Sequence, residues 1–121
     1  MRSKLPSSKA VLLLLIVCIF SLTIYLLSTT NTSYEMTVLN VFKDLKAGNY
    51  DAVEQFFVDA HQNKRLTPAG REYIESTFDR WYDTKHNLSD DTLQHINGWA
   101  KKYPDSPFAL LARSEYFYEK A

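Results

Sequence analysis

Residues 10–27 read AVLLLLIVCIFSLTIYLL, a run of 18 residues without a charged side chain. A helix of about 20 predominantly apolar residues is long enough to cross the hydrocarbon core of a bilayer. Three basic residues precede the run: Arg2, Lys4 and Lys9. No further Lys or Arg follows until Lys43. Because positive side chains favour the cytoplasmic side of a membrane, the pattern predicts a cytoplasmic N-terminus over residues 1–9, a transmembrane helix over residues 10–27 and export of the remaining chain.

The processing of this apolar run has three possible outcomes. A cleaved signal peptide has an apolar core of about 7–15 residues and small residues at the cut site. The present run is longer, and residues 28–33 (STTNTS) lack an Ala-x-Ala pattern, so we favour an uncleaved signal anchor. Cleavage within residues 28–33 stays an alternative. Lipoprotein processing at Cys18 is disfavoured because Val17 is large for the position before the modified cysteine.

Charge and cysteine content limit the work that the exported part can do. Cys18 is the only cysteine, so the exported part can form neither an internal disulfide nor a cysteine-based metal site. The formal net charge is zero, but three basic residues lie before the apolar run. Eleven basic and fourteen acidic residues remain after it, a net charge of −3. This mildly acidic, mixed surface argues against nucleic acid as a partner.

The chain after the apolar run reads as one small helical domain. Residues 28–33 are polar and uncharged, which suits a short tether, and residues 34–121 are near the lower size limit for a self-sufficient core. Apolar residues at helical spacing predict a first helix over residues 33–47, ended by Gly48. A second helix is predicted to begin with Asp51 as its N-cap.

Three further helices are predicted from their starting residues. The third begins with Thr67 as N-cap and Pro68 in the first turn, the fourth with Ser89 as N-cap, and the fifth with Ser106 followed by Pro107. No stretch alternates with a period of two for long enough to predict a strand. Short loops join antiparallel neighbours, so the sequence predicts an all-α fold in which a transmembrane helix is followed by about five short helices in stacked hairpins.

Two segments resemble the turns of tetratricopeptide-type helical hairpins. Residues 45–56 (LKAGNYDAVEQF) resemble the Gly-x-Tyr-x-x-Ala turn between the two helices of such repeats. Residues 99–109 (WAKKYPDSPFA) are similar to the Tyr-Pro-x-Ser-x-x-Ala turn between helices of bacterial repeat proteins. No regular 34-residue period spans the chain, so a regular repeat array is not predicted.

Together with the turn at residues 65–70, the aromatic helix that carries Trp81 and the segment at residues 112–115, these turns resemble an uncharacterised bacterial family. That family is a domain of unknown function with tetratricopeptide-like character, and the resemblance covers residues 40–121. The family's domain continues further, which leaves open whether residues 34–121 are a truncated, N-terminal part of it. The resemblance implies a bacterial inner membrane with the helical domain on its periplasmic side, and it supplies no catalytic residues.

No group of residues has the spacing of a metal or catalytic site. Metal-binding helices place ligands at i and i+3 or i+4, and none of the three histidines pairs in this way: His61, His86 and His95. Glu72, Glu75 and Asp79 read as the solvated side of a helix, and neither a nucleophile motif nor a phosphate-binding glycine loop occurs. We therefore predict no enzyme activity, metal, cofactor or small-molecule substrate.

Aromatic residues supply the candidate contacts for a protein or peptide partner. Trp81 and Tyr82 are adjacent and point about 100° apart on a helix, so we expect only one of them in the core. The exposed one, together with Trp99 and Arg113, is predicted to bind the partner, since aromatic and arginine side chains are enriched at binding hot spots.

The predicted function is a membrane-anchored scaffold or adaptor that binds other proteins. One alternative is an enzyme completed by residues beyond Ala121 or by another chain, which a buried carboxylate or histidine lining a pocket would indicate, such as Glu72 or His95. Another is a degenerate fragment without an independent role, which uncovered apolar faces on the last helix would indicate.

Overall fold

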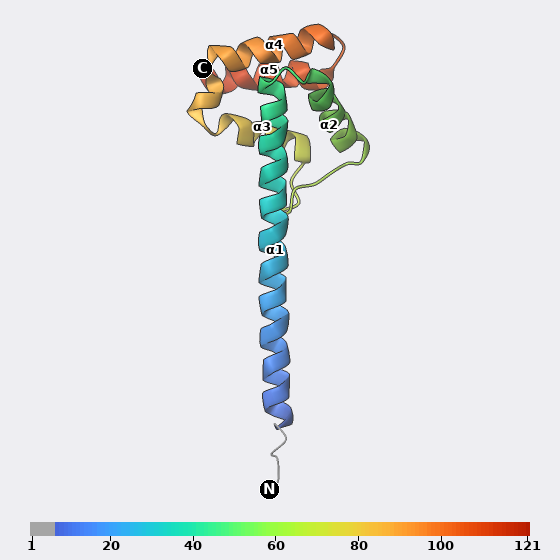
Figure 1. The fold of residues 1–121 in the computed structure, drawn as a ribbon, viewed down its shortest axis with the longest axis vertical. Coiled ribbons are helices and arrows are strands. Elements are labelled where there is room, and N and C mark those ends of the chain that lie inside the picture. The colour runs from blue at the N-terminus through green and yellow to red at the C-terminus, as the bar shows by residue number, and fades with distance from the viewer. Residues whose placement is uncertain (1–6) are drawn as a thin grey trace. The chain divides into compact units, whose positions relative to one another are not determined.

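The computed structural model describes residues 7–121, except for the side chains of residues 27–31. The described chain is helical, with one isolated β-bridge between Leu66 and Glu72, which confirms the predicted all-α class. The basic residues Arg2 and Lys4 lie outside the described residues. Figure 1 labels the helices α1 (Ser8–Lys46), α2 (Tyr50–Gln62), α3 (Tyr73–Tyr82), α4 (Asp90–Lys102) and α5 (Pro107–Lys120), and a short 3₁₀ helix, η1 (Lys85–Leu88), precedes α4.

Helix α1 continues through the segment that we predicted to be a tether. Residues 28–33 are helical, so the predicted break before a separate helix at residue 33 is wrong. The physical reason is that residues 7–47 contain neither Gly nor Pro, and Ser, Thr and Asn cost a helix only a few tenths of a kcal/mol each. The chain divides into two compact units, Met1–Ser33 and Tyr34–Ala121.

The first unit carries a helical segment, Ser8–Leu26, that is long and apolar enough to span a membrane. None of this segment is buried inside the protein. The core helix of a water-soluble protein would instead be mostly buried. The hydroxyl of Thr23 donates to the carbonyl oxygen of Ile19 at 2.9 Å, so this polar group is satisfied within its own helix. Cys18 is exposed on the same segment.

Aromatic rings form the centre of the second unit. The ring of Phe57 in α2 is fully buried, and its centroid lies 4.9 Å from that of Phe78, 5.4 Å from Trp99 and 6.0 Å from Phe108. These partners come from α3, α4 and α5, so one side chain joins four helices. Helix α1 adds buried aliphatic side chains to the same core: Val38, Val41 and Leu45.

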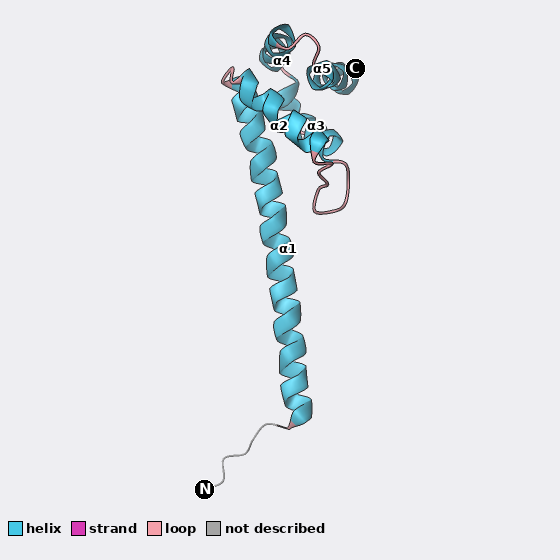
Figure 2. Cartoon of the chain, turned by 90° about the vertical axis from the view of Figure 1, so that its right-hand side faces the viewer, coloured by secondary structure: helices cyan, strands magenta, loops and turns pink. Residues whose placement is uncertain are grey.

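Helices α4 and α5 lie side by side (Figure 2), and their starts are as predicted. The hydroxyl of Ser89 accepts a hydrogen bond from the backbone N–H of Thr92 at 3.2 Å, and that of Ser106 accepts one from the backbone N–H of Ala109 at 3.2 Å. These bonds satisfy N–H groups that the first turn of a helix leaves without a partner. Pro107 occupies the first turn of α5.

The predicted starts of the second and third helices are wrong. Asn49 is the N-cap of α2, and Asp51 lies in its first turn. Helix α3 begins six residues after Thr67, with Glu72 as the N-cap whose carboxylate accepts from the backbone N–H of Glu75 at 3.1 Å. The reason is Gly70, whose φ of +81° turns the chain out of a helical path.

Gly98 in α4 marks a close approach between α2 and α4. A Cβ atom at this position would lie 2.4 Å from the hydroxyl oxygen of Tyr50. That hydroxyl is 3.0 Å from Nδ1 of His95 on the same helix as Gly98. The absence of a side chain at residue 98 therefore lets the tyrosine ring lie against the backbone of α4.

Removing the N-cap hydroxyls is expected to destabilise the second unit unequally. Ser106 also donates from its hydroxyl to Oε2 of Glu54 at 2.8 Å, a longer-range bond than any that the Ser89 hydroxyl makes. We expect Ser89→Ala to lower the free energy of unfolding by about 1 kcal/mol and Ser106→Ala by about 2 kcal/mol. Urea unfolding of both variants checks this order, and equal losses would mean that the bond to Glu54 contributes nothing.

Candidate interaction surface

Three of the four predicted contact residues are buried in the core. Trp81 is 2% exposed, Tyr82 4% and Trp99 0%. The expectation that only one of Trp81 and Tyr82 lies in the core is therefore wrong, and so is the choice of Trp99 as a surface contact. The indole N–H of Trp81 donates to the backbone oxygen of Val38 in α1 at 3.1 Å, and the hydroxyl of Tyr82 donates to that of Ala112 in α5 at 2.8 Å. Helix α3 therefore has α1 on one side and α5 on another, and Trp81 and Tyr82 are both covered although they point about 100° apart.

Trp99 is held by a carboxylate inside the domain. Its indole N–H donates to Oε2 of Glu54 at 2.8 Å, and the hydroxyl of Ser106 donates to the same oxygen. Glu54 thereby joins α2 to α4 and to the turn before α5. An open cavity of about 370 Å³ lies beside it, with Val58, Tyr103 and Phe108 among its lining residues. The carboxylate that borders this cavity thus already accepts hydrogen bonds from two side chains of the domain itself.

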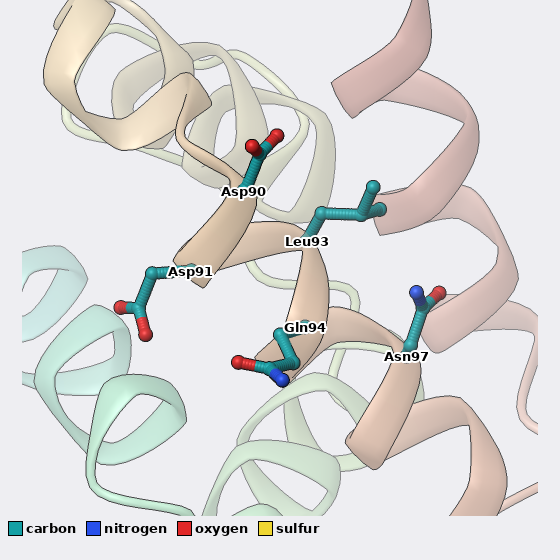
Figure 3. Close-up of a pocket in the computed structure, with 5 residues that line it drawn as sticks. All are labelled: Asp90, Asp91, Leu93, Gln94 and Asn97. Atoms are coloured by element: carbon teal, nitrogen blue, oxygen red, sulfur yellow. The ribbon is translucent and has the colours of Figure 1, made fainter.

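A second cavity, of about 380 Å³, lies along α4 (Figure 3). All of its lining residues come from this one helix: Asp90, Asp91, Leu93, Gln94 and Asn97. Their side chains point in different directions in Figure 3 and do not converge on a common point. Asp91 is also paired with Lys46. The cavity therefore lacks the convergent polar groups of a small-molecule site.

Glu72 and His95, the two residues named as indicators of an enzyme, do not line either cavity. Glu72 is exposed and caps α3. His95 is partly exposed, with Nδ1 hydrogen-bonded to Tyr50 and Nε2 3.9 Å from Oδ1 of Asp91, beyond hydrogen-bond reach. His61 and His86 are exposed. Among the described residues, no group of three or more His, Cys, Asp or Glu side chains could hold a metal ion.

Helix α5 has apolar residues on two opposite sides. One side is buried against the domain and consists of Phe108, Ala109, Ala112 and Tyr116. The other side faces outward, and its large apolar side chains are exposed by 53% (Leu110), 40% (Leu111), 50% (Phe117) and 77% (Tyr118). Ser114 lies between them on the same side, since residues three, four and seven apart share a face. We call these five outward residues the α5 strip: Leu110, Leu111, Ser114, Phe117 and Tyr118.

Charged residues of opposite sign border the α5 strip. Arg113 lies on one border, where its guanidinium carbon is 5.9 Å from the ring centroid of Phe117. Of the four predicted contact residues, only Arg113 is exposed. Glu115 lies on the other border. Partial burial, and then the nearby carboxylates of Asp79, Glu119 and Glu75, raise the pKa of the Glu115 carboxyl above its usual value.

The charge of Glu115 is expected to destabilise the domain at neutral pH. A raised pKa in the folded state means that stability is greatest when the carboxyl is protonated and falls as the pH rises through that pKa. Because solvent screens this side chain, we expect Glu115→Gln to raise the Tm by only about 1–3 °C at pH 7 and to leave it unchanged near pH 3. Thermal unfolding at both pH values measures this, and a lower Tm at pH 7 would contradict it.

Asp91→Asn is the control, and it is expected to change the Tm at pH 7 in the opposite direction to Glu115→Gln. A hydrogen bond from Lys46 is the main reason that the pKa of the Asp91 carboxyl is lowered. Its contribution to stability is present above its ordinary pKa and is lost on acidification. We therefore expect this variant to lower the Tm at pH 7.

The two apolar sides of α5 are visible in the sequence, although the choice of the exposed one is not. The pairs Leu110–Leu111 and Phe117–Tyr118 are seven residues apart and form one apolar side, while Phe108, Ala109, Ala112 and Tyr116 form another. A helix with two apolar sides buries one of them and exposes the other unless a neighbour covers each side. The pattern does not indicate which side is buried.

Comparisons with known proteins identify no relative. No family model matches the chain, and neither a curated protein nor a solved structure matches it significantly.

Proposed function

We propose that this chain is a single-pass, membrane-anchored helical module that docks a protein partner through the α5 strip. The observation that carries the proposal is the outward side of α5, which has four large apolar side chains exposed and no charge between them. Contiguous exposed apolar patches on folded domains mark interaction sites more often than isolated apolar residues do. The arginine and aromatic pair at its border, Arg113 and Phe117, belongs to the residue types that dominate binding hot spots.

The membrane part of the proposal rests on the segment Ser8–Leu26. The three basic residues before it and their absence up to Lys43 favour a cytoplasmic N-terminus, with the helical domain exported. The resemblance to a bacterial family leads us to place the domain on the periplasmic side of the inner membrane. The hairpin of α4 and α5, with Pro104 and Ser106 in its turn, is compatible with a tetratricopeptide-like arrangement.

The same outward side of α5 is also what a fragment without an independent role would present. An interaction module and such a fragment differ in what covers the α5 strip in the cell. An interaction module docks one defined protein there, and a fragment leaves the strip exposed to nonspecific association.

Photo-crosslinking in intact cells tests the proposal. A photoreactive phenylalanine analogue is placed at residue 111 or 117 of the full chain, and the control position is Gln55, which is exposed on α2. We expect adducts of one defined mass from residues 111 and 117 and none from residue 55. Equal, heterogeneous labelling from all three positions would reject a docking function and support a fragment.

A further inference from the structure

We propose that the α5 strip docks on the α5 strip of a second copy of this chain, with the two helices running parallel. The inference rests on the proposed function and names its partner. Three properties of the strip support it: the arrangement of large and small residues, the signs of the bordering charges and the extent of the surface.

The strip has a small residue between large ones. Ser114 lies at its centre, with Leu110 and Phe117 on one side and Leu111 and Tyr118 on the other. In a parallel pair each seam residue lies opposite its own counterpart, so Ser114 faces Ser114 of the second copy, and its small side chain lets the two helices approach closely there. The large side chains on either side of Ser114 then pack against those of the second copy, so that the two strips cover one another.

The bordering charges select the parallel orientation. In a parallel helix pair, opposite borders of the two helices meet, whereas in an antiparallel pair like borders meet. A parallel pair therefore brings Arg113 of each copy toward the Glu115 border of the other. Glu115 already lies among Asp79, Glu119 and Glu75, so an arginine from the second copy would offset a local excess of negative charge. An antiparallel pair would instead bring the two arginines together.

The size of the strip explains why the membrane segment matters to this pairing. Helix α5 has 14 residues and is about 21 Å long. We expect a pair of helices this short to bury an area at or below the lower end of the range of about 1,200–2,000 Å² that stable interfaces bury. Two copies confined to one membrane have a raised effective concentration. We therefore expect the pairing in membranes and not in dilute detergent solution.

Disulfide trapping of the full chain in membranes tests the parallel pair. In a Cys18→Ser background, single cysteines replace Leu110 or Ser114, and Gln55→Cys is the control. Mild oxidation is expected to link both strip variants into homodimers at least tenfold more than the control. Absence of a homodimer for Ser114→Cys would overturn the pairing. A Leu110→Cys chain that links to a co-expressed Tyr118→Cys chain and not to a second Leu110→Cys chain would overturn the parallel orientation.

Charge reversal tests the role of the borders. Arg113→Glu or Glu115→Arg alone is expected to reduce trapping through Ser114→Cys, because each homodimer then brings like charges together. Co-expression of the two charge variants is expected to restore trapping between unlike chains, whose borders are again complementary. Failure of the mixture to restore it would overturn the electrostatic basis of the orientation.

The outcomes separate this inference from the proposed function. Photo-crosslinks from residues 111 and 117 to a different protein, without trapped homodimers, would overturn self-pairing and leave the docking function standing. Absence of any specific adduct in both experiments would contradict the two together.

Discussion

Replacement of Phe57 with alanine is expected to lower the free energy of unfolding of residues 34–121 by about 3–5 kcal/mol. The ring is completely buried and lies between Phe78, Trp99 and Phe108. Its loss removes the transfer free energy of the ring and leaves a cavity that rigid aromatic neighbours cannot fill. Since small domains are stable by only about 5–15 kcal/mol, this single change is expected to leave a large unfolded fraction.

Tryptophan fluorescence during urea unfolding of the full chain in mild detergent measures this effect directly. Trp81 and Trp99 are both in ring contact with Phe57, at centroid distances of 5.6 Å and 5.4 Å. Phe117→Ala is the matched control, because the same ring is half exposed there and its loss is expected to change stability by less than about 0.5 kcal/mol. Equal midpoints for Phe57→Ala and the unmodified chain would contradict the packing described for α2.

The second large effect concerns the apolar segment of α1. We expect the double variant Leu14→Arg/Val17→Arg to lose membrane insertion. A charged residue near the centre of a spanning helix costs about 2.5–3.5 kcal/mol, so the two together cost about 5–7 kcal/mol. Both positions lie within Ser8–Leu26.

Alkaline extraction of membranes distinguishes the outcomes. The unmodified chain and a Leu14→Ala/Val17→Ala control are expected in the membrane pellet, and the arginine variant in the supernatant. Recovery of the unmodified chain in the supernatant would refute the anchor. Cleavage within residues 28–33 would remove Ser8–Leu26 from the domain, so N-terminal sequencing of unmodified protein recovered in the supernatant identifies that alternative.

Local signals in the sequence predicted the parts of the fold that depend on few residues. The starts of α4 and α5 were predicted because Ser89 and Ser106 satisfy the backbone of the helix that each precedes. The start of α3 was not predicted correctly. Thr67 and Pro68 resemble a helix start, but Gly70 turns the chain out of a helical path two residues later. The predicted tether was wrong because a polar composition without Gly or Pro does not interrupt a helix.

The candidate site was harder to predict because exposure depends on neighbouring helices. Trp81, Tyr82 and Trp99 are the residue types expected at a binding surface, yet α1, α2 and α5 bury all three. Arg113 was the one candidate that remained at the surface. The apolar residues of α5 were visible in the sequence, but the choice between its two sides depends on where α3 and α4 lie.

The contact between Gly98 and Tyr50 carries an evolutionary consequence. Glycine inside a helix ordinarily costs about 1 kcal/mol relative to alanine, so drift alone would replace it. The tyrosine hydroxyl occupies the space that a side chain at residue 98 would need. Homologues of this domain should therefore covary at these two positions, keeping glycine wherever residue 50 is a large aromatic and admitting alanine or serine only where residue 50 is smaller. An alignment with that covariation would identify genuine relatives even where the rest of the sequence has diverged.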